Sequence, residues 1–304
     1  HLLHAPDFLG FESGLAMAAT HPQLVENGLR LKALGNRLLE VVGGRAVHPI
    51  NVTVGGFYKA PAASAIRGLL PELAWGLDTC LSLLETVARF EVPQLDVPYE
   101  SVALQHEREY PMNEGQILSS GSEHTAPLRI EVEEFSRHFA ERQVPHSTAL
   151  HSLRLPNETA YLTGPIARMN LCRDQLPARA AAAAEACGLE WPIRNPYRSI
   201  VARVVEMVAA CEIASGIVRE AAGEISPCRV AYQPRAGSGC HATEAPRGLL
   251  YHRYRLDDQG LVAEATIIPP TSQNQAQVEE DLRGLLPSVL AFDDAEATRR
   301  CEML

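Results

Sequence analysis

The first long helix is predicted by apolar side chains that recur at three- and four-residue steps, the spacing that places them on one helix face. These residues are Leu31, Leu34, Leu38 and Val42. Gly43 and Gly44 follow, and glycine is typical of a helix end. We therefore expect a helix over Leu24–Val42. The same spacing predicts a second helix from Pro71, an early position that tolerates proline, to about Arg89.

The longest periodic segment is Tyr197–Ile225, and a helix of this length normally packs in a bundle. A shorter helix is expected over the alanine-rich stretch Arg179–Cys187. The charged stretch Glu131–Gln143 predicts a surface helix, and two further helices are expected from about Gln275 and from Asp293. The chain should therefore be mostly helical.

Strand signals are fewer. Leu249–Leu256 and Leu261–Ile268 flank the turn residues Asp257–Gly260 and predict a β-hairpin. Gly55 and Gly56 indicate a tight backbone passage, and residues 90–128 are expected to form loops with short strands. The predicted fold class is mainly α with a minor α+β part, a long-helix bundle with small β-hairpin additions in one large domain over residues 1–304.

The composition and charge of the chain limit the kinds of partner that it can bind. The 304 residues are 46% hydrophobic, enough for a substantial core, and carry a formal net charge of -10. An acidic chain without a basic stripe repels phosphate backbones, so nucleic acid is not an expected partner. The apolar runs are short and interrupted by charges, so we expect no transmembrane segment.

The seven cysteines are scattered, odd in number, and none forms a CxxC pair. This pattern argues against a disulfide framework and favours a reducing cytoplasm, with each thiol a small buried hydrophobe. Cys240 is followed by His241 in what we expect to be a glycine-rich loop. The positions are Cys80, Cys172, Cys187, Cys211, Cys228, Cys240 and Cys301.

The densest chemical signal is Glu244–Gly248. Pro246 fixes the backbone, Gly248 permits a close backbone approach, and Arg247 between them is thereby held in place. A fixed guanidinium can act as an electrostatic clamp or take part in proton movement. The alternative is a structural arginine paired with Glu244.

A second signal is Ile267–Asn274, where a predicted strand ends in two prolines followed by hydroxyl and amide side chains. Such a rigid polar end can donate hydrogen bonds to a small anion, although Thr271 or Ser272 can equally cap the next helix. At the start of the chain, His1 and His4 have a possible metal-ligand spacing, which alone is weak. Asp7 is a functional carboxylate or, alternatively, a helix N-cap.

These segments together resemble the large subunit of [NiFe]-hydrogenases, and the resemblance runs through the whole chain. Within that family the chain is most similar to the cytosolic group that couples hydrogen to NAD(P). The segments that carry it are His48–Asn51 with Gly55–Phe57, Val144–Ser147 with Ala149–His151, Gly164–Arg168, Glu244–Gly248 and Pro269–Asn274.

The resemblance implies a nickel and an iron bridged by cysteine thiolates, with carbon monoxide and cyanide on the iron. Arg247 matches the arginine above the open bridging site that contacts a cyanide, and Asp7 matches the carboxylate that orients it. Pro246 and Leu250 match apolar walls around the diatomic ligands.

Pro270 and Thr271 match the segment whose hydroxyl and amide hydrogen-bond the second cyanide, and Ile267 matches a position whose backbone carbonyl ligates a structural magnesium. The implied reaction is the reversible heterolytic oxidation of H2. A terminal cysteine thiolate or the arginine serves as base, and both remain open. Electrons would pass to a small iron–sulfur subunit, then to a nicotinamide-reducing module, in a hetero-oligomer.

The chain departs from the family in one respect: neither of the two CxxC motifs, one near each end of the family sequence, is present. His1–Asp7 resembles the segment after the first motif, and Arg299–Leu304 resembles the segment before the second. We expect a fragment truncated at both ends, and the alternative is a natural protein that has lost the metal. The chain alone should bind no nickel and be inactive.

Two other functions compete with hydrogenase. The quinone-binding subunit of respiratory complex I shares the bundle, a Gly-Gly passage and an Arg-Gly segment, and it lacks both cysteine pairs. A scaffold or assembly protein without chemistry is the other alternative, and the absence of cysteine ligands is its only support.

Overall fold

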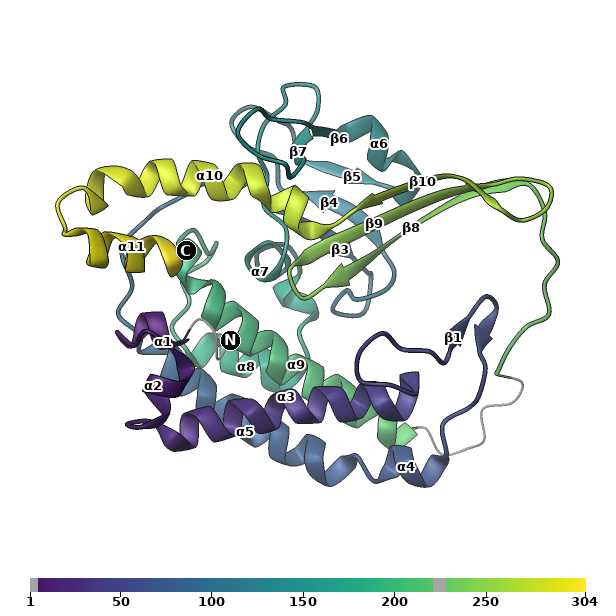
Figure 1. The fold of residues 1–304 in the computed structure, drawn as a ribbon, viewed down its shortest axis with the longest axis horizontal. Helices are drawn as coiled ribbons and strands as arrows, with labels where there is room; N and C mark the ends of the chain where they lie inside the picture. The colour runs from purple at the N-terminus through teal and green to yellow at the C-terminus, as the bar shows by residue number, and fades with distance from the viewer. Residues whose placement is uncertain (1–4, 221–227) are drawn as a thin grey trace. The chain divides into compact units, whose positions relative to one another are not determined.

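The computed structural model describes residues 5–220 and 228–304, which divide into two compact units (Figure 1). The first unit comprises residues 1–90, 177–183 and 204–234, and the second comprises residues 91–176, 184–203 and 235–304. His1 and His4, whose spacing is possible for metal ligands, lie outside the described residues. The end of the predicted helix beyond Glu220 also lies outside them.

The first unit is helical. Its elements are α1 (Ala5–Phe8), α2 (Gly14–Ala18), α3 (Pro22–Gly43), α4 (Ala63–Arg67), α5 (Leu70–Ala88) and the short strands β1 (Val52–Thr53) and β2 (Gly56–Phe57). Two helices run through both units, α8 (Ala178–Ala186) and α9 (Ser199–Glu220). The long helices predicted from apolar periodicity are thereby confirmed.

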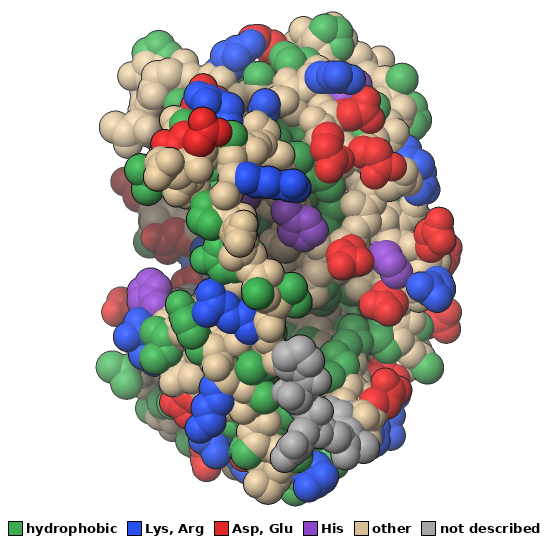
Figure 2. All heavy atoms as spheres, turned by 90° about the vertical axis from the view of Figure 1, so that its right-hand side faces the viewer, with side chains coloured by type: hydrophobic (Ala, Val, Ile, Leu, Met, Phe, Trp, Pro, Cys, Tyr) green, Lys and Arg blue, Asp and Glu red, His purple; other side chains and the backbone are tan. Residues whose placement is uncertain are grey.

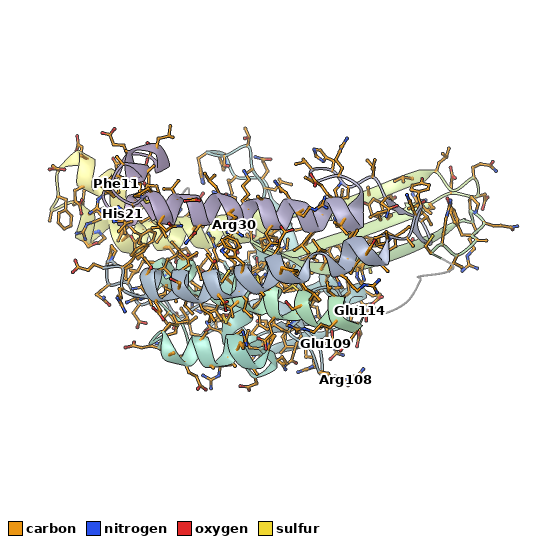
Figure 3. All side chains as sticks on the ribbon, turned by 90° about the horizontal axis from the view of Figure 1, so that it is seen from below. Phe11, His21, Arg30, Arg108, Glu109 and Glu114 are labelled. Carbon is orange, nitrogen blue, oxygen red and sulfur yellow. The ribbon has the colours of Figure 1, made fainter. Side chains whose placement is uncertain are left out.

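Helices α3 and α5 pack through a buried cluster that includes Leu34 and Leu73. A Cβ on Gly76 would stand 2.6 Å from the Leu34 side chain, so this glycine allows the close helix approach. Arg30, labelled in Figure 3, stacks its guanidinium 3.7 Å from the centre of the Trp75 ring on α5. Apolar and cation–π contacts thus join the same two helices.

Three of the glycines that the sequence singled out in this unit occupy backbone conformations that favour glycine. Gly44 ends α3 at φ 78°, and its amide donates to the carbonyl of Glu40. Gly55 and Gly56 have φ of 85° and 141°, and a Cβ at either would collide with a backbone carbonyl of residues 228–230. The predicted tight passage at Gly55–Gly56 is confirmed.

The second unit contains most of the strands. These are β3 (Val102–Gln105), β4 (Gln116–Ser119) and β5 (Leu128–Ile130) in one sheet, β6 (Phe139–Arg142) with β7 (His151–Arg154), and β8 (Gly237–Ala245), β9 (Gly248–Leu256) and β10 (Val262–Ile268) in the order β10-β9-β8. Its helices are α6 (Phe135–His138), α7 (Pro165–Cys172), α10 (Pro270–Val289) and α11 (Asp294–Glu302), with 3-10 turns at Val132–Glu134, Arg173–Gln175 and Pro196–Arg198.

The core of the second unit is aromatic. Phe135 lies between Phe139 and Tyr251, with ring centroids 4.7 and 4.3 Å away, and all three side chains are buried. The rings join the β6 hairpin to the β8–β10 sheet. Burial of rings this large contributes much of the unit's apolar free energy.

In this unit two predicted elements are wrong, and a third is present with an earlier start. Glu131–Gln143 is a 3-10 turn, one turn of helix and strand β6, because Phe135 and Phe139 turn inward to the aromatic core and β6 pairs with β7. Cys240 and His241 lie in strand β8, which pairs with β9, and not in a loop. Helix α10 begins at Pro270, five residues before the prediction, since proline is well suited to a first helical turn.

These additional strands change the fold class. The described residues are 46% helical and 18% strand, so the fold is a mixed α and β fold, and the prediction of a mainly α fold is only partly confirmed. The predicted β9–β10 hairpin is confirmed, with Ile268 opposite Tyr251. No helix in residues 5–220 and 228–304 is long and apolar enough to cross a membrane. Figure 2 shows acidic and basic side chains intermixed on one face.

Candidate functional site

Arg247 lies at the tip of a two-residue turn. Ala245 pairs with Gly248 at the end of the β8–β9 ladder, which leaves Pro246 and Arg247 as the turn residues. Strand β10 ends and α10 begins at this same end of the sheet (Figure 1). The arginine side chain is exposed, and no ion pair to it is found among the described residues. Its guanidinium is therefore available to a ligand.

Two glycines let this turn touch the segment before α7. Gly164 has φ 102°, and a Cβ there would stand 2.7 Å from the carbonyl oxygen of Arg247. Gly248 has φ 135°, and a Cβ there would collide with the side chain of Thr163. The close backbone approach predicted for Gly248 is thus confirmed, and its partner is the start of α7.

Asn274 forms hydrogen bonds to both the β8–β9 turn and the segment before α7. Its side-chain oxygen accepts from the amide and hydroxyl of Thr163, at 2.7 and 3.1 Å. Its side-chain nitrogen donates to the carbonyl of Arg247, at 3.1 Å. One side chain from the first turn of α10 therefore fixes both the β8–β9 turn and the start of α7.

A pocket of about 230 Å³ opens between these elements, and both Arg247 and Thr271 line it. The residues that the sequence proposed as donors to a small anion are therefore brought together, although 24 positions separate them. Both α7 and α10 begin at this pocket, and helix N-termini favour anions. The other lining residues are Tyr99, Leu162, Thr163, Pro165, Ile166, Pro196, Ser199, Arg203, Asn274, Gln275, Val278, Asp281 and Leu304.

The four polar residues at the start of α10 divide between pocket and core. Thr271 and Asn274 line the pocket. The hydroxyl of Ser272 donates to the carbonyl of Pro269, and Gln273 is fully buried with its amide donating to the carbonyls of Leu249 and Ile268. The N-cap position is Pro269, so the alternative of a Thr271 or Ser272 N-cap is wrong.

Glu244 has a different partner from the one that the sequence suggested. Its carboxylate forms a buried ion pair with Arg168 of α7 at 2.6 Å, and it also accepts from the amide of Leu104 at 2.8 Å. Arg168 further donates to the carbonyl of Ala245, at 2.9 Å. The structural arginine beside the turn is therefore Arg168, and the alternative that paired Arg247 with Glu244 is wrong.

Asp281 is a pocket residue that the sequence analysis missed. Its side chain is buried and accepts hydrogen bonds from Tyr99 and Gln277, both at 2.9 Å. Burial raises the pKa of Asp281 to about 6, although both hydrogen bonds act to lower it. A carboxyl that titrates near neutrality and lines a pocket is suited to accept and release a proton. Its four-residue spacing from Gln277 was the only signal in the sequence.

The remaining predicted site residues do not line this pocket. Pro246 adjoins Arg247 in the turn, Leu250 lies opposite Thr243 in the β8–β9 ladder, and Pro270 is the first residue of α10. Ile267 lies in β10 opposite His252, with its side chain half exposed. Asp7 lies inside α1 of the first unit, and not at a helix N-cap. The roles predicted for these residues remain predictions.

The prediction that each cysteine is a buried hydrophobe is confirmed for two of the seven, and the other five are half-buried. All seven are free thiols, and Cys80 and Cys172 are fully buried. Burial raises the pKa of Cys172 to about 12, which makes it an inert hydrophobe. None of the seven lines the pocket of Arg247 and Thr271.

The chain is similar in sequence to hydrogenase subunits and in fold to solved hydrogenase structures. No family model matches the chain. It is 29% identical over 286 residues to the alpha subunit of sulfhydrogenase 1 from Pyrococcus furiosus, covering 93% of this chain and 65% of that subunit. It is 26% identical over 313 residues to one subunit of the F420-non-reducing hydrogenase vhu from Methanococcus voltae, covering 93% and 73%.

The solved structures agree in fold. A structure of NAD+-reducing [NiFe]-hydrogenase in the H2-reduced state superimposes with a TM-score of 0.84 at 21% identity, over 99% of this chain and 72% of that one. A [NiFeSe]-hydrogenase from Dm. baculatum superimposes with a TM-score of 0.59 at 16% identity, over 87% and 62%. The predicted relationship to [NiFe]-hydrogenase large subunits is confirmed, and the complex I alternative is not favoured.

Proposed function

We propose that this chain forms part of the catalytic subunit of a [NiFe]-hydrogenase, which carries out the reversible heterolytic oxidation of H2. The observation that carries the proposal is the placement of Arg247 and Thr271 in one pocket, with their backbones tied together through Asn274. The likeness to hydrogenase subunits extends over 93% of the chain. The chain spans 65% of the length of the sulfhydrogenase subunit, so the activity belongs to the whole protein.

The pocket suits the ligand side of a nickel–iron centre. Cyanide on iron is a small anion, and a dry pocket that holds it needs fixed donors. Arg247 supplies a guanidinium, and Thr271 supplies a hydroxyl and a backbone amide in the first turn of α10. Pro246 and Leu250 would form the apolar walls, and Asp7 would orient Arg247. When bound, the metal pair supplies the Lewis acid that accepts a hydride.

The thiolate side of such a centre is not supplied by these residues. Nickel binding of this kind requires soft cysteine ligands, and none of the seven cysteines lines the pocket. This chain's own contribution to catalysis is therefore to bind and orient the diatomic ligands and to hold protons near them. Asp281 offers a further proton acceptor in the same pocket, since burial raises the pKa of its carboxyl to about 6.

The assembly is proposed from the family resemblance. Electrons would pass to a small iron–sulfur subunit, then to a nicotinamide-reducing module, in a cytoplasmic hetero-oligomer. The fold likeness to an NAD+-reducing [NiFe]-hydrogenase supports this choice of partner. The backbone carbonyl of Ile267 would ligate a structural magnesium.

Hydrogen-dependent dye reduction by the complete large subunit, assembled with its partner, tests the proposal. Arg247→Lys keeps the charge and removes the planar fork of donors, so we expect at least about a 100-fold loss of rate with unchanged nickel and iron content. Arg253→Lys is the matched control, because Arg253 is an exposed arginine on β9. If an assembled wild-type complex takes up nickel and iron but reduces no dye with H2, the proposed hydrogenase function is excluded.

A further inference from the structure

Two histidines and a glutamate converge in the second unit, in a cluster that plays no part in the pocket of Arg247. His146 lies in the loop after β6, His151 is the first residue of β7, and Glu279 lies on α10. The Nε2 atom of His146 is 2.8 Å from Oε1 of Glu279, and the Nε2 atom of His151 is 3.4 Å from the same oxygen. The three ligand atoms all lie within 4.8 Å of one another.

His151 gives the independent reason to expect a ligand here. Its side chain is 5% exposed, and its Nε2 atom has no hydrogen-bond partner in the part of the chain that the structure describes. A buried polar atom without a partner costs about 1–3 kcal/mol, so native proteins rarely leave one unsatisfied. A cation coordinated by that nitrogen removes the cost.

Glu279 is held in an orientation that suits a shared ligand. Arg283, one turn further along α10, donates to its Oε2 atom at 3.1 Å. This bond leaves Oε1 directed at both imidazoles. Carboxylates that ligate metals are commonly oriented by a second hydrogen bond of this type. The guanidinium also offsets the negative charge, so the cluster favours a cation that forms strong bonds to nitrogen over one held by charge alone.

We propose that His146, His151 and Glu279 bind a divalent transition metal, with Zn²⁺ the cation that the ligand set fits best. Imidazole nitrogens select transition metals over Mg²⁺ and Ca²⁺, and two histidines with one glutamate are an established zinc ligand set. With metal–ligand bonds of about 2.0–2.1 Å, neighbouring ligands of a tetrahedral site lie about 3.3 Å apart. The 3.4 Å separation of His151 from the carboxylate is close to this value, and the 2.8 Å separation of His146 is a hydrogen bond that the cation would replace.

The site lies at the surface of the second unit and between two of its elements. The side chain of His146 is 58% exposed, so the cation can enter from solvent and keep a water as its fourth ligand. The metal would join the β6–β7 hairpin to α10, the helix whose first turn carries Thr271 and Asn274. This proposal is independent of the hydrogenase reaction, because none of the three ligands lines the pocket.

Titration of the purified, chelator-treated chain with Zn²⁺ against a chromophoric chelator, and with Co²⁺ followed by its d–d absorption, tests the site. We expect the wild type to bind one equivalent more than Glu279→Gln, and His146→Ala to lower the affinity at least about 100-fold. Both variants leave the buried His151 in place, so the fold is kept. Zn²⁺ should also raise the Tm of the wild type and not that of Glu279→Gln.

His124→Ala is the matched control. His124 is an exposed histidine 3.3 Å from a carboxylate oxygen of Glu123, but no third ligand is placed with this pair among the described residues. We expect its zinc stoichiometry and affinity to equal those of the wild type. Equal zinc stoichiometry and affinity in the wild type, Glu279→Gln and His146→Ala would overturn the proposal and leave the cluster an ordinary His–Glu ion pair.

Discussion

The side-chain nitrogen of Asn274 donates a hydrogen bond to the backbone carbonyl of Arg247, 3.1 Å away. Arg247 therefore has its backbone fixed by a residue of another element, at the pocket that both residues line. The same asparagine accepts from Thr163. The planar amide of asparagine provides an acceptor for Thr163 and a donor for Arg247 on two separate atoms.

Replacing Asn274 should therefore lower the stability of the fold. Asn274→Leu removes three hydrogen bonds and leaves the amide of Thr163 without its acceptor, so we expect the free energy of unfolding to fall by about 2–3 kcal/mol. Urea denaturation measures this loss. Gln275→Ala, which alters the next pocket residue on α10, should cost less than about 1 kcal/mol. Equal losses in the two variants would contradict the role given to Asn274.

The close approach of the two turns makes Gly164 sensitive to any side chain. In Gly164→Ala the new Cβ meets the carbonyl oxygen of Arg247, and φ of 102° is itself strained for alanine. We expect a loss of about 2–4 kcal/mol in the free energy of unfolding. Gly188→Ala separates the two effects, since Gly188 has φ of 70° with nothing within 4 Å of its Cβ position. Its loss should be about 1 kcal/mol.

The buried ion pair of Arg168 and Glu244 should depend strongly on both partners. Glu244→Gln leaves the guanidinium buried without a counter-charge, and we expect about 3–5 kcal/mol of destabilisation in guanidinium chloride denaturation. The double variant Arg168→Met with Glu244→Gln removes the unpaired charge as well. It should be less destabilised than the sum of the two single variants, and additive losses would show that the pair is not coupled.

Asp281 should give the stability a pH dependence of unusual sign. Because its pKa rises from 3.8 in the unfolded chain to about 6 in the folded one, the folded state binds more protons between these values. Its contribution to stability therefore falls as the pH rises from about 4 to 6 and is constant above that window. A shift of this size corresponds to at most about 3 kcal/mol.

The comparison of Asp281→Asn with the wild type isolates this contribution from that of the other carboxylates. We expect the difference in unfolding free energy, variant minus wild type, to shift in favour of the variant by up to about 3 kcal/mol between pH 4 and pH 7. Urea denaturation at several pH values measures it. Asp258→Asn, in the exposed β9–β10 turn, should show no such shift. A pH-independent difference for Asp281→Asn would disprove the raised pKa.

The elements that the sequence predicted correctly are those whose signal is local. Helices α3 and α5 follow from three- and four-residue apolar spacing, and the β9–β10 hairpin follows from its turn residues. Strand β6 was missed because a charged stretch that could be helical becomes a strand only when Phe139 packs on Phe135 and Phe135 packs on Tyr251, more than a hundred residues away. Tertiary packing overrides local propensity in such segments.

The residues of the candidate site also differ in whether a local sequence signal predicts them. Arg247 and Thr271 were predicted because proline and glycine next to them restrict the backbone in a recognisable pattern. Asp281 was missed because its burial depends on Tyr99, which lies 182 positions away. The segment with His146 and His151 contributes to the family resemblance, but the sequence does not predict the proposed zinc site. Its third ligand, Glu279, lies 133 positions after His146. No spacing rule along the chain connects such pairs.

The buried amide of Gln273 has a consequence for the length of the chain around the site. Its amide donates a hydrogen bond from α10 to the backbone carbonyl of Leu249, two residues after Arg247. Asn274, on the same helix, donates to the backbone carbonyl of Arg247. One residue inserted between Arg247 and Leu249 would therefore break one of these two hydrogen bonds, although no side chain of the pocket is changed. Insertions and deletions should be tolerated in the β9–β10 turn at Asp257–Gly260 and excluded from this short segment. The spacing of these residues is thus constrained as tightly as their identity.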